Sequence, residues 1–135
     1  WRNSSGTSLL NFAASGNIVN TNNSYGQISD IKLKENIVNA TPKLEELNQV
    51  RVVNFNLKSD PAQKQLGVIA QELELIFPGM VDESFDSEGT PAKSVKYSVF
   101  VPMLIKAMQE QQTIIQESMD RIEKLEARVS ALEGA

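Results

Sequence analysis

The chain has 135 residues, of which 41% are hydrophobic and 22% charged, and its formal net charge is −4. This composition is too apolar for a disordered chain, and the acidic balance excludes a general attraction to nucleic acid or to anionic membranes. The sequence contains no His and no Cys. It therefore excludes disulfides, thiolate zinc sites and nucleophile pairs of the Ser-His or Cys-His type. No apolar run reaches about 18 residues, so no membrane-spanning helix is expected.

The first 28 residues differ in composition from the rest. They are rich in Ser, Asn, Gly and Thr, and Arg2 is their one charged side chain. Two apolar pieces, Leu9–Phe12 and Ile18–Val19, flank Ser15–Asn17 and predict short strands joined by tight turns. A flexible linker fits this segment, and so does the end of a β-rich fibre whose strands need neighbouring chains. The N-terminus lacks the apolar core of a signal peptide, and we expect an internal piece of a longer protein.

A hydroxyl and two amines fall within the six residues Ser29–Lys34. In a chain without His or Cys, a Ser with a Lys as its base is the familiar covalent route that stays open. A tethered hydroxyl can attack the carbonyl just before it through a five-membered ring, and water then opens the ester. Lys34 is the candidate base when it is neutral, a state that burial and the nearby charge of Lys32 favour.

The spacing of this pair raises a geometric difficulty. Positions 29 and 34 would point to opposite faces of a flat strand. A bulge, a turn or a contribution from a neighbouring chain is therefore needed to bring Ser29 and Lys34 together. An ordinary serine and a solvated lysine fit the same residues.

The next stretch has the pattern of a compact α+β unit. Thr41 and Pro42 suit the N-cap and the first position of a helix that stops near Asn48. Alternation predicts a strand over 51–57 whose inward residues are Val53, Phe55 and Leu57.

Further short elements are expected downstream of this strand. In chain order they are a turn at Ser59–Pro61, a buried strand at Leu66–Ala70, a helix at Gln71–Phe77 ended by Pro78 and Gly79, and a strand pair at Val81–Phe85 and Ser94–Tyr97 joined by Ser87–Pro91. The lone Gly67 indicates tight packing rather than nucleotide binding, since no phosphate loop is present.

Acidic side chains gather around these turns, namely Glu72, Glu74, Asp82, Glu83, Asp86 and Glu88. A divalent cation site and a solvated acidic face both fit such a cluster. EF-hand spacing is missing, so we predict no metal site and no cofactor.

One long helical pattern covers residues 99–132, with Pro102 at its start. Its apolar seam consists of Leu104, Met108, Ile115, Met119, Ile122, Leu125, Val129 and Leu132. The steps 4, 3, 3, 4, 3 from Ile115 onward are a heptad seam with one skipped residue, and Gln111 and Gln112 fill the seam positions before Ile115. A small unit cannot cover so long a rod. We therefore expect the seam to face the same seam on other chains, although a helix folded back on its own unit is the alternative.

Three blocks in order carry a family resemblance: Ser29–Ile37; Gly67–Leu73 with Phe77, Pro78 and Val81; and Tyr97–Ala107 with Gln109–Gln112. They resemble the C-terminal intramolecular chaperone, or self-cleaving peptidase, domain of phage tailspikes and tail fibres. The same family includes domains of endosialidase tailspikes, phage neck appendages and myelin regulatory factor. The resemblance implies a homotrimer that helps the preceding fibre to fold and then cuts itself off.

The resemblance places the cut between Ile28 and Ser29, with Ser29 as nucleophile and Lys34 as base. Asp30 and Lys32 would support the site, although Lys32 stands where the motif often has Arg and lacks the guanidinium fork. The expected fold class is α+β, a small mixed α/β unit followed by a long C-terminal helix in a trimeric coiled coil or helical bundle.

The implied segments are the end of a β-rich fibre (1–28), the chaperone and autoprotease core (29–98) and the long helix (99–135). The implied partners are two further copies and the upstream fibre segment, with no nucleic acid and no membrane. The implied location is the virion tail, with the precursor in the host cytoplasm and the cleaved chaperone released. The rival hypothesis is a structural trimerisation module that caps a fibre and never cuts.

Overall fold

The computed structural model describes residues 4–5, 10–12, 18–21, 25–86 and 88–135. The chain divides into two compact units, residues 1–39 and 40–135, which are described separately. These two units are defined by packing within a single chain. They do not test the predicted functional segments 1–28, 29–98 and 99–135, which stay predictions.

The described residues of the first unit form a strand pair and a helical turn. Strands β1 (Leu10–Phe12) and β2 (Ile18–Asn20) run antiparallel with Leu10 opposite Asn20. The predicted strands are therefore present, while Leu9 and the predicted turn at 15–17 lie outside the described residues. A 3₁₀ helix, η1 (Ile31–Leu33), follows in an otherwise irregular stretch.

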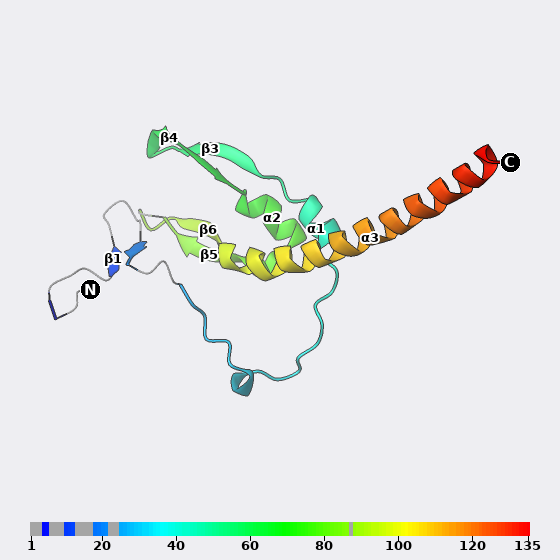
Figure 1. The fold of residues 1–135 in the computed structure, drawn as a ribbon. Helices are drawn as coiled ribbons and strands as arrows, with labels where there is room; N and C mark the ends of the chain where they lie inside the picture. Colours follow the sequence, from blue (N-terminus) through cyan, green and yellow to red (C-terminus); the bar gives the residue numbers. More distant parts are fainter. Residues whose placement is uncertain (1–3, 6–9, 13–17, 22–24, 87) are drawn as a thin grey trace. The chain divides into compact units, whose positions relative to one another are not determined.

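In the described part of the second unit, short helices alternate with two antiparallel hairpins, and a long helix follows (Figure 1). Its elements are α1 (Leu44–Asn48), β3 (Val53–Leu57), β4 (Asp60–Gly67), α2 (Ala70–Ile76), η2 (Pro78–Met80), β5 (Val81–Phe85), β6 (Pro91–Val95), η3 (Tyr97–Val99) and α3 (Phe100–Glu133). The α+β class and the long C-terminal helix are confirmed.

The core of this unit is small. Leu73 of α2 is 1% exposed, and Phe77 and Met80 are buried beside it. Partly buried side chains of α1, β5, β6 and α3 pack around these three residues, including Leu47, Val81, Val95, Phe100 and Met103. Burying an apolar side chain of this size contributes about 1.5–3 kcal/mol, so Leu73 anchors α2 against its neighbours.

The start of the first helix differs from the prediction. Helix α1 begins at Leu44, and its N-cap is Lys43, whose side chain makes no cap hydrogen bond. Thr41 and Pro42 precede the helix and do not cap it. The cap is supplied from α3 instead, as described below, so a tertiary contact replaced the local signal.

The β3–β4 hairpin exposes two leucines that the sequence pattern alone would bury. Val53 and Phe55 of β3 are half-buried as predicted, but Leu57 is exposed beyond an irregularity between Asn56 and Leu57. Leu66 is 70% exposed. Of the strand predicted over 66–70, Leu66 and Gly67 belong to β4, which ends at Gly67, and Ala70 is the first residue of α2. A two-stranded sheet with little packed against it leaves such side chains in water.

Turn positions also shift by a few residues. The β3–β4 turn is Lys58–Ser59, so Asp60 and Pro61 open β4 rather than forming the turn. The strand β6 is Pro91–Val95, whereas the prediction ran from Ser94 to Tyr97. Tyr97 belongs to η3, from which its hydroxyl reaches back toward β4.

Candidate functional site

Ser29 and Lys34 lie in direct contact: Lys34 Nζ donates a hydrogen bond to Ser29 Oγ at 2.6 Å. The η1 turn between them removes the difficulty raised by their spacing. Within it Leu33 N–H bonds the Asp30 carbonyl at 3.0 Å, and Lys34 N–H bonds the Ile31 carbonyl at 3.1 Å. A turn, rather than a strand, therefore lets side chains five residues apart meet.

Asp30 holds the start of this turn. Its backbone is extended, with φ −66° and ψ 134°, and its carboxylate accepts the Lys32 backbone N–H at 2.9 Å. This is an N-cap, in which a side-chain oxygen satisfies one of the free N–H groups of the first turn. Asp30 thus holds the turn that carries Ser29 and Lys34 together, a contact that the sequence motif alone did not reveal.

The Lys32 side chain is exposed, and no carboxylate among the described residues pairs with it. Its ammonium group is therefore an unshared positive charge two residues from Lys34. The orienting carboxylate contact expected of an Arg at this place is not formed within the described part of the chain.

The segment that carries the pair is open to water and exposes several apolar side chains. Ile28, the residue before the expected cut, is 80% exposed, and Ile31 and Leu33 of η1 are similarly exposed. All described residues from Tyr25 to Pro42 are exposed. Exposed isoleucine and leucine side chains near this pair are apolar surface that association with another chain could bury.

The predicted seam residues lie along α3, with side chains between 46% and 77% exposed (Leu104, Met108, Ile115, Met119, Ile122, Leu125, Val129 and Leu132). Every residue from Gln111 to the C-terminus is exposed, and this part of α3 extends beyond α1 in Figure 1. The alternative of a helix folded back on its own unit therefore does not describe the C-terminal half of α3.

Glu110 ties α1 to α3, which sequence reasoning missed. Its carboxylate accepts the backbone N–H of Lys43 at 2.9 Å and of Leu44 at 3.0 Å, the free donors at the start of α1. Partial burial alone would raise the pKa of Glu110, but the two N–H donors and the charges of Lys106 and Lys43 outweigh it, and the pKa is lowered. No local signal could reveal a cap that comes from more than sixty residues away.

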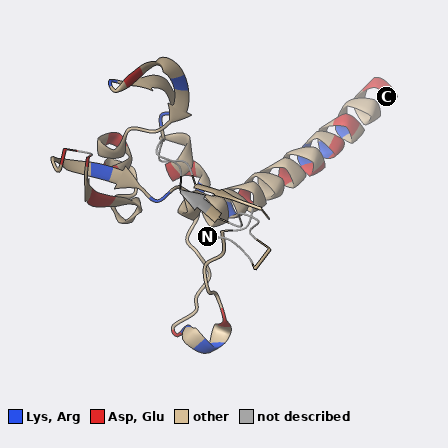
Figure 2. Ribbon diagram, turned by 90° about the vertical axis from the view of Figure 1, so that its left-hand side faces the viewer, with Lys and Arg blue, Asp and Glu red and all other residues tan. Residues whose placement is uncertain are grey.

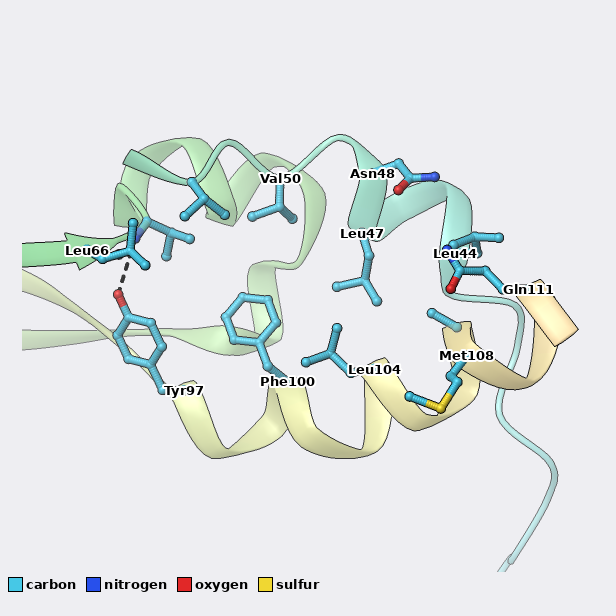
Figure 3. Close-up of a pocket in the computed structure, with 14 residues that line it drawn as sticks. Leu44, Leu47, Asn48, Val50, Leu66, Tyr97, Phe100, Leu104, Met108 and Gln111 are labelled. Atoms are coloured by element: carbon cyan, nitrogen blue, oxygen red, sulfur yellow. Dashed lines mark hydrogen bonds between the residues drawn. The ribbon is translucent and has the colours of Figure 1, made fainter. Parts of the chain in front are cut away.

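An apolar groove of about 620 Å³ opens between α1, the end of β4, η3 and α3 (Figure 3). Its wall includes Leu47, Val50, Phe100, Leu104 and Met108. Two of the predicted seam residues, Leu104 and Met108, thus line this groove as well.

Gly67 and Tyr97 meet at one end of the groove. The Tyr97 hydroxyl accepts the Val68 backbone N–H at 3.2 Å, and a Cβ on Gly67 would lie 2.6 Å from that hydroxyl oxygen. The glycine makes room for a side chain, which is the tight packing predicted for it.

The acidic side chains near the turns mostly have partners. Arg51 donates to both carboxylate oxygens of Glu72, and these hydrogen bonds lower the pKa of Glu72 and raise that of Arg51. Glu74 pairs with Lys93 and Asp82 with Lys96, while Asp86 accepts backbone N–H groups of its own turn. Among the described residues no group of acidic side chains is arranged to hold a metal ion. In the same part of the chain no helix combines the length and apolarity needed to cross a membrane.

Comparisons with known proteins agree with the resemblance. Residues 29–82 match the family described as chaperone of endosialidase. The chain is 32% identical over 84 residues to the long tail fiber protein Gp37 of Enterobacteria phage K3 and to that of Enterobacteria phage T2. The alignments cover 59% of this chain and 7% and 6% of those proteins, so the chain spans a small part of the relatives that it matches.

Proposed function

We propose that this chain, which resembles the chaperone-of-endosialidase family over residues 29–82, is an intramolecular chaperone of a phage tail fibre that releases itself by self-cleavage. One observation carries the proposal: a Lys34 Nζ to Ser29 Oγ contact of 2.6 Å within the matched segment. The tail-fibre names of the two relatives support the fibre as the client and the virion tail as its location. The precursor would be made in the host cytoplasm, and the chaperone would leave the mature fibre after the cut.

The proposed cleavage is an intramolecular acyl transfer. Neutral Lys34 takes the hydroxyl proton of Ser29 while Oγ attacks the carbonyl carbon of Ile28. The bond from that carbon to the Ser29 nitrogen breaks, an ester to Oγ forms, and the proton passes to the freed amine. Water then hydrolyses the ester, leaving a carboxylate on Ile28 and a free amine and hydroxyl on Ser29. The tether between attacking and attacked atoms supplies most of the rate advantage.

Assembly is the step that we expect to switch this chemistry on. In the single chain the pair is exposed, and acyl transfer proceeds best where water is excluded and donors face the developing oxyanion. The exposed Ile28, Ile31 and Leu33 favour transfer of this segment into an apolar setting once copies associate. Cleavage would then report completed assembly and act as quality control.

The partners are two further copies of the chain and the upstream fibre segment. Three helices joined along the exposed seam of α3 would hold three upstream segments together and raise their local concentration. Non-local β pairing is slow to start, so this clasp lowers its entropic cost. The cut removes the template and leaves the fibre kinetically trapped.

A second candidate function is a trimerisation cap that never cuts. The exposure of Ser29 and Lys34 in the single chain favours it, because ordinary surface residues would look the same. It shares the helix association and differs only in the chemistry.

Intact mass spectrometry of the freshly expressed chain separates the two candidates. Cleavage between Ile28 and Ser29 yields a fragment that begins at Ser29, whereas Ser29→Ala stays full length. Ser59→Ala, in the exposed β3–β4 turn, is the matched control and should be cut normally. A Ser29→Ala chain that still yields the same fragment would show that the nucleophile is misassigned. A wild-type chain that assembles but stays uncut would support the trimerisation cap instead.

A further inference from the structure

Helix α3 runs without interruption from Phe100 to Glu133, so one seven-residue repeat can be laid along its whole length. One seam position is then occupied by Met108, Ile115, Ile122 and Val129, and the other by Leu104, Gln111, Ser118, Leu125 and Leu132. Met119 lies beside the seam in this register, and no skipped residue is needed. Ser118 fits a seam position because its hydroxyl already bonds the Ile114 carbonyl at 2.7 Å.

The positions that flank this seam are chemically complementary. On one side lie Ile114, Arg121 and Arg128, and on the other lie Met119, Glu126 and Glu133. In parallel helices aligned in register, each residue of the first set faces the residue five positions later on its neighbour. The facing pairs are then Ile114 with Met119, Arg121 with Glu126, and Arg128 with Glu133. Antiparallel helices would bring like charges together.

Four charges along the flanks of this seam have no ion-pair partner among the described residues. No ion pair within the described residues involves Arg121, Glu126, Arg128 or Glu133. All four side chains are exposed, and Figure 2 shows the alternation of blue and red along this half of the helix. These four side chains can therefore pair with a neighbouring chain without breaking an ion pair among the described residues.

The surface of the helix also carries a receptor site for an apolar side chain. A shallow groove of about 480 Å³ is lined by Ile122, Leu125, Glu126, Val129 and Ser130. Ile122 and Val129 are consecutive residues of the first seam position. Between them lie Leu125, at the second seam position, and Glu126, which flanks it. Four residues in this relation form the hole into which a Leu at position 125 of a parallel neighbour inserts.

We infer that residues 114–133 of α3 bind a second copy of this chain in parallel and in register, with Arg121 and Arg128 of one copy on Glu126 and Glu133 of the next. This inference rests on the self-association in the proposed function and not on the cleavage. Parallel alignment places the N-terminal ends of all α3 helices at one end of the assembly. Their upstream segments are then held at that same end, as templating requires.

Charge reversal tests the pairing. The double variant Glu126→Arg/Glu133→Arg faces arginine with arginine, and we expect its dissociation constant at low salt to rise by about 10-fold or more. Adding Arg121→Glu and Arg128→Glu reverses every pair and should restore association. Glu117→Arg/Glu123→Arg changes the net charge equally on the outer face of the helix and should leave association unchanged. Wild-type association of the first variant, or no rescue in the fourfold variant, would overturn the pairing.

Cross-linking tests the orientation, because the wild-type chain has no Cys. Leu132→Cys should form disulfide-linked pairs on mild oxidation, since parallel helices bring the two thiols together near one end. Ala127→Cys, on the outer face, should not. An assembled Leu132→Cys chain that fails to cross-link would overturn the parallel register. An assembly that pairs as expected but stays uncut would contradict the self-cleavage and not the pairing. Failure of the pairing and failure of the cleavage are therefore distinguishable.

Discussion

Lys34 Nζ lies 2.6 Å from Ser29 Oγ across one 3₁₀ turn, so the nucleophile and base of the proposed reaction sit on one short local element. Such a pair needs no long-range packing to form. What assembly has to add is the exclusion of water and the stabilisation of the oxyanion.

Lys34→Arg is the sharpest test of the base. Arginine keeps the positive charge but does not lose its proton in proteins, so we expect cleavage to slow by about 100-fold or more with assembly intact. The rate is read from the appearance of the fragment that begins at Ser29. Lys32→Arg, two residues away, is the matched control and should cleave near the wild-type rate. Wild-type cleavage of Lys34→Arg would assign the base elsewhere.

Asp30 should act through the geometry of the turn. Asp30→Ala removes the acceptor for the Lys32 N–H, and loss of an N-cap typically costs about 1 kcal/mol, which corresponds to a roughly fivefold slower cut. Asp30→Asn retains an acceptor oxygen and should retain most of the rate. Equal loss in both variants would show that the charge of Asp30 matters, and not its cap.

The Glu110 carboxylate should make the second unit sensitive to acid. Its pKa is lowered in the folded chain, so its contribution to stability is present at neutral pH and is lost as the pH falls from about 4.5 through the folded-state pKa. At pH 7 we expect Glu110→Ala to lower the Tm by about 5 °C, because α1 loses its cap. The difference from wild type should shrink in acid.

Thermal melts at one protein concentration and several pH values measure this effect. Glu117→Ala, exposed on the same helix, is the control and should change little. A Glu110→Ala penalty that stays constant from pH 7 down to pH 3 would contradict the proposed origin of the contact's stability.

Ile122→Asp should separate the chains and stop processing together. A carboxylate at the centre of the seam would be buried without a partner in the assembly. Light scattering should then give single chains, and mass spectrometry should find them uncut. Ala127→Asp, on the outer face of α3, should assemble and cleave normally. Efficient cutting in monomeric Ile122→Asp would break the link between assembly and cleavage.

Elements set by local pattern were predictable, and contacts between distant residues were not. Apolar periodicity placed α2, β5 and α3 within about one residue of their observed bounds, because each follows its own pattern and turn signals. The cap on α1 was missed because Glu110 comes from another helix. Alternation predicts an inward Leu57 and an apolar run predicts a buried Leu66, but neither pattern reveals that β3 and β4 form a two-stranded sheet.

The candidate site divides in the same way. The motif and the absence of His and Cys are enough to name Ser29 and Lys34. Their contact depends on η1, which the six-residue sequence does not predict. The turn forms because Asp30 accepts the Lys32 N–H, a local bond whose pattern is visible only once the backbone is known.

Association of three chains is the claim on which the proposed chaperone depends, and the mass of uncut Ser29→Ala at micromolar concentration tests it most directly. Size-exclusion chromatography with light scattering should give three times the chain mass of 14.9 kDa. A folded species with the mass of one chain would contradict the proposal.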